Sequence, residues 1–345
     1  MGHRVVGIDA GRVASGAAGR NGGILRPGVA AFHHDAIRAL GRDCVVRIFE
    51  MTMGELRRFA DHDPGTVVRT GLLRLAGSDT EYADCMQQRD EMLADGLRAA
   101  AYTGPLGRGV FLADGGTFQP IERCRTLARN AAGAGARLFE QSTALSIVRG
   151  EVGTQRGRIR CASIVVAVDG RLEALLPELE GQVRTARLQM LASGPDREVA
   201  LPCPVALNYG FDYAQQLRNG CVVLGGGRDG AMQDEWTHRT EPTQPVQDHL
   251  DRLLRGRFGV RAPITHRWGA SASYSTTGLP VLAEVRAGVW VIGAYSGTGN
   301  LLGALAGRAV ARTSCGERCE FASLLAPPHA RAFVDVAALP RRSAC

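Results

Sequence analysis

Lysine is absent from the sequence, and all 41 basic residues are arginines. The arginines are scattered in ones and twos among 34 acidic residues, without the basic block that follows a nucleic-acid backbone. Nucleic acid is therefore not predicted as a partner. The net charge of +7 attracts anionic ligands only modestly.

Long apolar runs are also absent. None approaches the roughly 20 residues of a membrane-spanning helix, and no secretory leader is recognisable. The nine cysteines are an odd number without a repeating spacing, which disfavours a disulfide framework. Cys315 and Cys319 lack further ligands nearby, and the eight histidines do not cluster, so no metal site is predicted. These absences predict a cytoplasmic protein with reduced thiols.

The first stretch of the chain carries the strongest pattern. Val5–Asp9 is a short apolar run that ends in an acid, and residues 10–23 form a loop rich in glycine. In a dinucleotide-binding βαβ unit the second strand ends this way, and its carboxylate binds ribose hydroxyls. A G-x-G-x-x-G turn normally lies about 20 residues before that acid. The sequence shows no such turn before Asp9, so we expect a nucleotide domain without its phosphate-binding turn.

Hydrophobic periodicity organises the first half of the chain. Apolar residues at steps of three and four predict helices, and short apolar runs predict strands. The predicted helices cover 31–62, 80–101 and 120–133, and the predicted strands cover 5–9, 66–75, 136–140, 144–148 and 158–168. A helix followed by three strands is the order of an α/β nucleotide domain with an inserted meander.

The predicted secondary structure changes twice in the second half of the chain. Strands dominate from 184 to 268 and predict a mostly antiparallel substrate domain, before α/β texture returns after 281. The predicted strands are 186–192, 205–209, 213–216, 221–225 and 289–294, and the predicted helices are 245–255 and 301–312. We therefore expect two interleaved domains. The nucleotide-binding domain comprises 1–65, 110–180 and 281–345, and the substrate domain comprises 66–109 and 181–280.

Several short motifs follow one another in a fixed order. They are I-D-A-G at 8–11, S-G-x-x-G-R-N-G-G at 15–23, G-G-x-x-x-P at 115–120, I-V-V-A-x-x-G at 164–170, R-x-Q-M-L-A at 187–192, L-G-G-x-R-D at 224–229, R-W at 267–268, G-L-P at 278–280 and G-T-G-N-x-L-G at 297–303. Together they resemble the FAD-dependent oxidoreductases of the D-amino-acid-oxidase superfamily. The nearest branch is the amine-oxidising one that includes γ-glutamylputrescine oxidases, and the resemblance covers nearly the whole chain.

The resemblance implies an α/β fold in which a Rossmann-like FAD-binding domain is interleaved with a mostly antiparallel α+β substrate domain. It also implies cofactor contacts. These are Asp9, Ala10 and Gly11 at the adenosine ribose, Ser15, Gly16, Arg20, Asn21, Gly22 and Gly23 around the pyrophosphate and flavin, Ala144, Ala167 and Gly170 at the adenosine half, and Gly297, Thr298, Gly299, Asn300 and Leu301 at the flavin pyrimidine. No histidine follows the arginine of the R-N-G-G loop and no cysteine lies near Trp268, so FAD is expected to bind non-covalently.

The implied reaction is oxidation of a C–N bond of a small amine. Hydride passes to the flavin, the imine hydrolyses to a carbonyl compound, and O2 or another acceptor reoxidises the flavin, giving H2O2 in the first case. Relatives that oxidise amino acids place an arginine four residues after the tryptophan, but this chain has Ala272, which disfavours an α-amino acid. Tyr213, Arg228 and Trp268 are predicted to line the catalytic pocket. The alternative is a structural Arg228–Asp229 pair beside a core tyrosine.

Two rival interpretations remain at this point. In the first, the chain is a working enzyme. In the second, it is a truncated, non-catalytic relic or a mis-started fragment with impaired FAD binding, and strand 5–9 has an unpaired edge. An NAD(P) dehydrogenase is weaker, because it explains neither the R-N-G-G loop nor the G-T-G-N turn. Gly225–Gly227 follow a strand without a helix directly behind them, which favours a hairpin or bulge over a phosphate loop.

Overall fold

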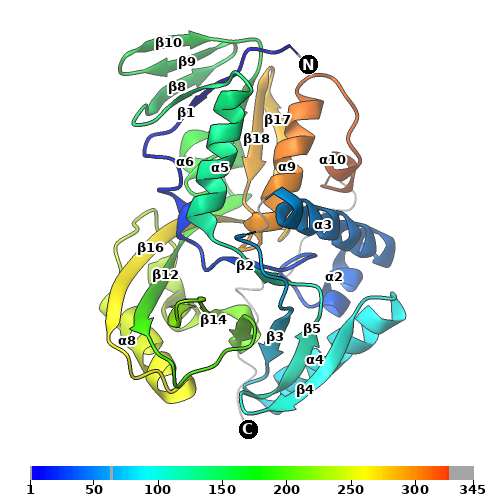
Figure 1. Ribbon diagram of the computed structural model, residues 1–345. Helices are drawn as coiled ribbons and strands as arrows, with labels where there is room; N and C mark the ends of the chain where they lie inside the picture. The colour runs from blue at the N-terminus through cyan, green and yellow to red at the C-terminus, as the bar shows by residue number, and fades with distance from the viewer. Residues whose placement is uncertain (1, 63–64, 326–345) are drawn as a thin grey trace.

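An eight-stranded sheet fills one half of the molecule in the computed structural model, which describes residues 2–62 and 65–325 (Figure 1). All its neighbours are antiparallel except β13 and β3, which run parallel. The strand order is β16 (Ile264–Ser275), β12 (Val183–Pro195), β15 (Cys221–Gly225), β14 (Asp212–Gln216), β13 (Val205–Leu207), β3 (Leu72–Leu75), β5 (Gly107–Leu112) and β4 (Ala99–Gly104). The prediction of mostly antiparallel strands in this part of the chain is confirmed.

Two helices cover parts of this sheet. Val246 and Leu250 of α8 (Gln244–Arg252) pack with Leu191 and Leu224 of the sheet in one buried cluster. Helix α4 (Asp79–Ala94) packs against β4 and β5 at the other end. The strands come from 72–112 and 183–275, which fall largely within the segments assigned above to the substrate domain. The division into two domains stays a prediction, and its last segment extends past the described residues.

The other half contains parallel α/β pairs. Strand β1 (Val6–Ile8) pairs in parallel with β7 (Arg137–Phe139), and β11 (Ile164–Val166) pairs in parallel with β18 (Val289–Gly293). Hairpin partner β17 (Val281–Arg286) flanks β18. The helices of this half are α3 (Arg42–His62), α5 (Pro120–Gly133), α9 (Gly299–Thr313) and the short α6 (Leu172–Leu175) and α10 (Glu320–Leu325). Parallel pairs with covering helices confirm the mixed α/β class.

A three-stranded meander stands at the end of this half (Figure 1). It consists of β8 (Ala144–Val148), β9 (Glu151–Thr154) and β10 (Gly157–Arg160). The prediction of a single strand over 158–168 is wrong, because this segment forms two separate strands, β10 and β11. A small ribbon of β2 (Ile24–Leu25) and β6 (Gly116–Thr117) lies between the two halves.

Glycine ends two helices earlier than the periodicity predicts. Gly41, with φ 84°, divides the predicted helix 31–62 into α2 (His33–Leu40) and α3. Gly96, with φ 71°, follows the end of α4, so the predicted helix 80–101 is wrong beyond Ala94. Its alanine-rich end forms β4 instead, because pairing with β5 outweighs the helix propensity of alanine.

Other predictions are closer to the structure. Pro120 occupies the first turn of α5, as expected. The apolar stripe of α3 is buried at Phe49, Met53, Leu56 and Phe59. Gly225–Gly227 end β15 and lead into a 3-10 turn at Asp229–Ala231 and the short α7 (Met232–Glu235), so a helix does begin sooner than the sequence indicated.

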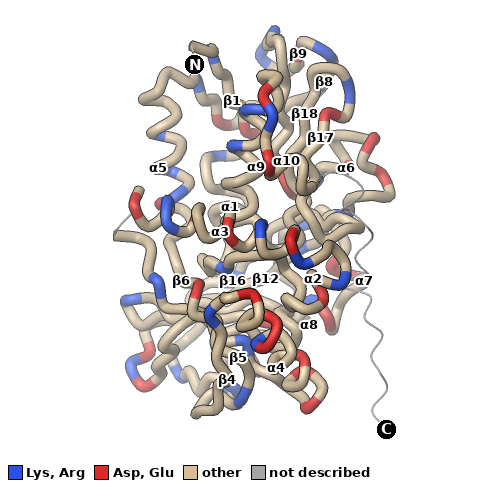
Figure 2. Tube along the Cα trace, turned by 90° about the vertical axis from the view of Figure 1, so that its right-hand side faces the viewer, with Lys and Arg blue, Asp and Glu red and all other residues tan. Residues whose placement is uncertain are grey.

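Charges of both signs are interspersed along the chain (Figure 2). The eight cysteines within the described residues are free. None of the helices in that part of the chain combines the length and apolar character required to cross a membrane.

Candidate functional site

Asn21 joins the two glycine-rich segments of the chain. Its amide nitrogen donates to the carbonyls of Ala17 (3.2 Å) and Ala18 (2.8 Å) in α1 (Ala17–Arg20). Its Oδ1 accepts from the backbone N–H of Gly23 (2.9 Å) and from Asn300 Nδ2 (3.2 Å). Residues 15–23 and the turn before α9, nearly 300 residues apart in the chain, are therefore held together by one side chain.

The turn before α9 is unusual in its backbone. Ala294 and Ser296 have φ of 53° and 50°, and Gly297 has φ of 84°. Positive φ at two non-glycine residues costs free energy and is found most often at functional sites. The hydroxyl of Thr298, the N-cap, donates back to the Tyr295 carbonyl (2.8 Å) and makes no capping hydrogen bond. The first N–H groups of α9 thus remain available to a ligand.

These two segments form one wall of a cavity of about 280 Å³. Leu188, Tyr213 and Tyr274 of the sheet, and Arg228 just after β15, line the same cavity. The predicted cofactor residues that line the cavity are Asn21, Gly22, Gly297, Thr298, Asn300 and Leu301. The structure therefore brings six of the residues predicted at the pyrophosphate and flavin, and two of the three predicted catalytic residues, around one space.

Tyr213 lies against the glycine loop. A Cβ added to Gly22 would stand 3.1 Å from the Tyr213 ring and 3.3 Å from the Met190 methyl, so only glycine fits without a shift. Burial, and next Tyr274 and Asp212, raise the pKa of Tyr213 far above neutral pH. The phenol therefore keeps its proton at neutral pH and does not act as a base.

Arg228 is 6% exposed and surrounded by aromatic rings. Its guanidinium carbon lies 4.5 Å from the ring centre of Tyr274, 5.0 Å from that of Trp236 and 5.5 Å from that of Phe211. Asp229 instead accepts a hydrogen bond from Asn208 (2.7 Å). The alternative of a structural Arg228–Asp229 pair is thus absent among the described contacts, and the aromatic rings provide the favourable environment for this cation.

Trp268 does not line the cavity. Its indole N–H donates to the carbonyl of Arg20 (2.8 Å), and Arg20 Nη1 donates to the carbonyl of Gly269 (3.0 Å). This reciprocal pair ties α1 to β16. The structure therefore places Trp268 and Arg20 behind the glycine loop. Gly23 and Gly299 also lie outside the lining, against Phe118 and Tyr295 respectively.

The predicted adenosine-side residues gather at the end of β1. Asp9 Oδ1 accepts from the N–H of Gly11 (2.7 Å), and the carbonyl of Asp9 accepts from Ser142 (2.7 Å) near Ala144. Ser15 Oγ accepts from Arg12 in the same loop (3.1 Å). Asp9, Ala10, Ser15 and Gly16 are exposed there. Ala167 and Gly170 follow β11, where a Cβ on Gly170 would stand 2.5 Å from the Ser271 carbonyl.

Asp169 is a half-buried carboxyl that the sequence did not single out. Its oxygens accept from the N–H groups of Ser273 (3.3 Å) and Tyr295 (3.4 Å), so it links β16 to the turn before α9. Burial raises the pKa of Asp169 from 3.8 to about 6, against the lowering effect of these hydrogen bonds. The carboxyl thus connects protonation to the geometry of the turn.

Replacing Asp169 with asparagine should remove a pH dependence of stability. A raised carboxyl pKa favours the folded, protonated state, so its contribution is present below about pH 4 and is lost as pH rises towards about 6. The loss amounts to about 3 kcal/mol in the wild type and is absent in Asp169→Asn, which tolerates the φ of 55°. Urea unfolding at pH 4 and pH 7 measures it, with exposed Asp234→Asn as the control. Equal pH slopes in wild type and Asp169→Asn would contradict the assignment.

Sequence reasoning missed three further cavity-side groups. Arg26 and Tyr274 line the cavity, and the side chain of Gln215 donates to the carbonyl of Gly22. Tyr274 lies on β16 six residues after Trp268, so the strand alternation was a usable signal for it. Arg26 directly precedes Pro27-Gly28, just after the glycine-rich loop, and no sequence pattern there predicts that it lines the cavity.

Strands that end in glycine-rich segments around a largely apolar cavity define a protein that binds a nucleotide cofactor. A family model described as FAD dependent oxidoreductase matches residues 1–313, and the chain belongs to this family. It is similar to a probable oxidoreductase, OrdL, of Rhizobium meliloti (strain 1021). The two are 26% identical over 343 residues, which cover 91% of this chain and 78% of the relative.

Solved structures share the fold. Glycine oxidase from Geobacillus kaustophilus has a TM-score of 0.77 and 19% identity, covering 93% of this chain and 90% of that one. Iminodiacetate oxidase (IdaA) from Chelativorans sp. BNC1 has a TM-score of 0.69 and 17% identity, covering 92% and 91%. The resemblance to the D-amino-acid-oxidase superfamily is therefore confirmed, and the chain is an FAD-dependent oxidoreductase.

The residues around the cavity fit a flavin. A planar ring needs walls without Cβ atoms, and Gly22 and Gly297 supply them beside the uncapped start of α9. N–H groups and about half a positive charge at a helix start suit the electron-rich pyrimidine edge of the ring.

Proposed function

We propose that the chain oxidises a C–N bond of a small amine and uses non-covalently bound FAD as the hydride acceptor. The amine would give its hydride to the flavin and a proton to solvent, and the resulting imine would add water and split into the carbonyl product and ammonia or an amine. Oxygen as the final acceptor would take up two electrons and two protons and leave as H2O2. The observation that carries the proposal is that the segments of Asn21 and Asn300 and the side chains of Tyr213 and Arg228 line one cavity.

The flavin-side residues would bind the cofactor and stabilise negative charge on its ring. Gly297 to Leu301 would meet the pyrimidine end of the ring, where the N–H groups at the start of α9 stabilise negative charge that develops during hydride transfer. Asn21 and Asn300 hold those donors in place. Asp9, Ser15 and the neighbouring glycines would hold the adenosine half at the end of β1, in an FAD domain made of 1–65, 110–180 and 281–345.

The substrate-side residues orient the amine. No carboxylate or histidine is among the described residues that line the cavity, and Tyr213 keeps its proton. A neutral amine that gives up hydride directly needs no protein base, and this lining suits such a reaction. Tyr213 and Arg228 are the proposed pocket residues, while Trp268 supports the loop from behind.

The names of two structural neighbours point to amines that carry a carboxylate. Glycine and iminodiacetate, after which these oxidases are named, both have an α-carboxylate, whereas Ala272 disfavours an α-amino acid in this chain. Neither neighbour is close enough in sequence to transfer its substrate to this chain.

A visible spectrum after incubation with FAD and desalting tests the proposal. Bound flavin that is bleached anaerobically by a member of an amine panel supports it, and H2O2 release in air identifies the acceptor. Turnover should fall at least tenfold in Tyr213→Phe and in Arg228→Gln, because each removes a pocket donor. Unchanged turnover in both variants would contradict the pocket assignment.

A second candidate is a fold with impaired FAD binding. Strand β1 pairs only with β7 among the described strands, so its other edge is unpaired as predicted, and Val5 and Val6 are 53% and 42% exposed. An open edge beside Asp9 weakens the adenosine site. A colourless protein after desalting, with intact secondary structure, would favour this candidate over the enzyme.

A further inference from the structure

Asp212, the first residue of β14, is a buried carboxylate next to the lining of the large cavity. It is 4% exposed, and its neighbours in the chain, Phe211 and Tyr213, both line the cavity. Its Oδ1 accepts a hydrogen bond from the backbone N–H of Gly227 (2.8 Å), the residue before Arg228. One carboxylate therefore connects the start of β14 to the turn that leads into Arg228.

This turn is packed tightly on the carboxylate. Gly226 and Gly227 have φ of 147° and 75°, which favour glycine. A Cβ added to Gly226 would overlap Asp212 Oδ1, and a Cβ added to Gly227 would stand 3.0 Å from a ring carbon of His249. Gly226 and Arg228 both line the cavity. The position of the Asp212 carboxylate therefore fixes the path by which the chain reaches Arg228.

His249 of α8 links the same carboxylate to solvent. Its Nε2 lies 3.0 Å from Asp212 Oδ1, and its side chain is 35% exposed. The hydrogen bond to Asp212 is the largest cause that raises the pKa of His249 above the ordinary 6.5, against the lowering effect of burial. The charge of His249 therefore changes in the range of pH near neutrality.

The other charged groups around His249 are weaker influences. Asp229, in the 3-10 turn after β15, also raises its pKa, and Arg252 of the same helix lowers it. Strand β12, which packs against α8, carries Arg187, and this cation is already paired with Glu235 (2.7 Å). On α8 itself, Asp251 pairs with Arg255 (3.4 Å) and Arg267 (3.8 Å). Asp212 is thus the main partner of the histidine.

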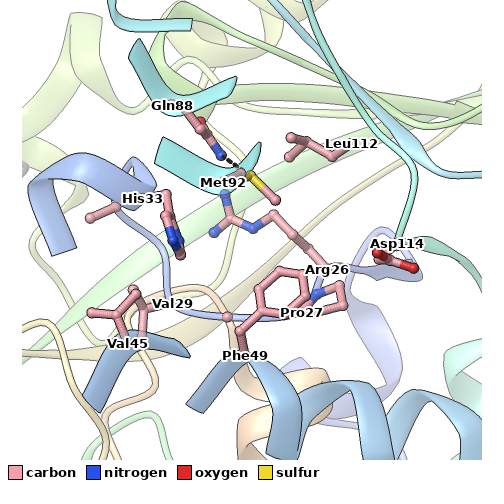
Figure 3. Close-up of a pocket in the computed structure, with 12 residues that line it drawn as sticks. Arg26, Pro27, Val29, His33, Val45, Phe49, Gln88, Met92, Leu112 and Asp114 are labelled. Carbon is pink, nitrogen blue, oxygen red and sulfur yellow. Dashed lines mark hydrogen bonds between the residues drawn. The ribbon is translucent and has the colours of Figure 1, made fainter. Parts of the chain in front are cut away.

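Three other histidines lie near a carboxylate among the described residues, but none combines an exposed ring with a contact to the turn after β15. His33, which lines the side cavity shown in Figure 3, is buried beside Asp95. His34 is also buried, and burial lowers its pKa. His238 is exposed but binds Glu173, which does not line the large cavity. The pair on α8 is therefore the one that can transmit solvent pH to this turn.

The charge of Asp212 acts on the cavity lining. Burial, then Tyr274 and then Asp212 raise the pKa of Tyr213, whereas Arg228 lowers it. A protonated His249 offsets the charge of Asp212 through a charge-assisted hydrogen bond, which is about twice as strong as a neutral one. A neutral His249 leaves the negative charge to attract the Arg228 cation in a medium of low dielectric constant.

We propose that Asp212 is a positioning residue that holds Arg228 at the cavity, and that protonation of His249 controls how it does so. When His249 is charged, it binds Asp212 and leaves Arg228 among its aromatic rings. When His249 is neutral, the carboxylate draws the guanidinium away from Trp236. The consequence for turnover rests on the proposed amine oxidation, in which Arg228 is a pocket residue. The movement itself depends on no substrate.

An NMR titration of the full chain with labelled tryptophan, with FAD present, tests this link without turnover. The chain has three tryptophans, and the Trp236 signal is identified by its loss in Trp236→Phe. The Trp236 ring centre lies 5.0 Å from the guanidinium carbon of Arg228, so its indole N–H reports on that cation. In the wild type this signal should move with a midpoint above pH 6.5. The movement should be lost in His249→Gln and in Asp212→Asn.

Two histidine variants are the matched controls. His62→Gln removes an exposed histidine at the end of α3 and should leave the movement unchanged. His238→Gln removes a histidine two residues from Trp236, which pairs with Glu173 (2.9 Å), and should also leave it unchanged.

Other outcomes overturn the link. A Trp236 signal that does not change with pH in the wild type shows that the cavity lining does not respond to the histidine. Loss of the movement in His238→Gln, with the movement retained in His249→Gln, assigns it to the other pair. If Asp212→Asn does not fold, His249→Gln and His249→Asn carry the same comparison.

A pH profile of turnover separates this proposal from the proposed function. For any amine that is oxidised, the ratio of kcat/KM at pH 8.5 to that at pH 6 should differ about 3- to 10-fold between the wild type and His249→Gln. The ionisation of the amine cancels, because both proteins meet the same substrate. Asp212→Asn keeps an acceptor for the N–H of Gly227 and should show the profile of His249→Gln. Equal profiles in all three proteins overturn the positioning role. Oxidation of no amine, together with a Trp236 signal that depends on His249, overturns the proposed reaction alone.

Discussion

Replacing Asn21 with leucine should give a folded protein that loses its yellow colour on desalting. Asn21 contributes four hydrogen bonds, to Ala17, Ala18, Gly23 and Asn300, and leucine can make none of them. Each contributes about 0.5–1.5 kcal/mol, so losing the group costs roughly 2–6 kcal/mol of the free energy that orders the wall formed by the two glycine-rich segments. The affinity for FAD should then fall by about 30-fold to 10⁴-fold. Fluorescence titration of the apoprotein with FAD measures this loss.

Two further variants show whether the network, and not the bulk of leucine, is responsible. Asn21→Asp keeps the oxygen that accepts from Gly23 but loses the donors to α1, and we expect an intermediate affinity. Asn130→Leu places the same change on the exposed face of α5 and should bind FAD as the wild type does. Wild-type FAD affinity in Asn21→Leu would show that the glycine loop does not contact the cofactor.

Local patterns predicted two glycine-rich segments that the structure brings together. Glycine spacing and the position of a helix start are short-range features, so residues 15–23 and 297–301 were found from the sequence and do meet in space. Tyr213 and Arg228 were found because each belongs to a motif on a predicted strand or its end. Trp268 was predicted by the same reasoning but does not line the cavity, because strand direction alone does not tell which end of β16 faces it.

Long-range pairing explains most of what the sequence left out. The pairing of Asp114 with Arg98 and of His33 with Asp95 is visible only in three dimensions. Residues 99–101 of β4 were predicted to be helical because alanine favours helices. In the structure they pair with β5 through backbone hydrogen bonds, which outweigh that preference. Arg187 was noted as part of a motif, yet its partner Glu235 lies 48 residues away.

Replacing Glu235 with glutamine should produce the largest loss of stability among the variants considered. Glu235 and Arg187 are 1% and 5% exposed, and they form a two-pronged ion pair with N–O distances of 2.7 and 2.9 Å. Gln189 donates to the same carboxylate (2.9 Å). Removing one partner of a buried pair leaves the other charge uncompensated and costs about 3–5 kcal/mol. Urea unfolding of the FAD-free protein measures the change.

The variant should also disturb the cavity. Glu235 directly precedes Trp236, whose ring packs edge-on against Tyr274 at 5.6 Å and lies 5.0 Å from the Arg228 guanidinium. The ion pair therefore holds the aromatic surroundings of Arg228 against β12. Tryptophan fluorescence should shift in Glu235→Gln before any denaturant is added, because Trp236 loses its anchor.

A double replacement tests whether the charges of Arg187 and Glu235, or only the volume of their side chains, stabilise the fold. Arg187→Met with Glu235→Leu removes both charges and fills the space, so most of the lost stability should return, since an apolar pair avoids the cost of burying ions. The matched surface control is Glu320→Gln, which breaks the exposed pair with Arg47 and should have little effect because water screens both charges. If the double variant is less stable than Glu235→Gln alone, the ion pair is not the main stabilising interaction here. The hydrogen bond from Arg187 Nη1 to the carbonyl of Glu241 (3.0 Å) then stabilises this side of the cavity.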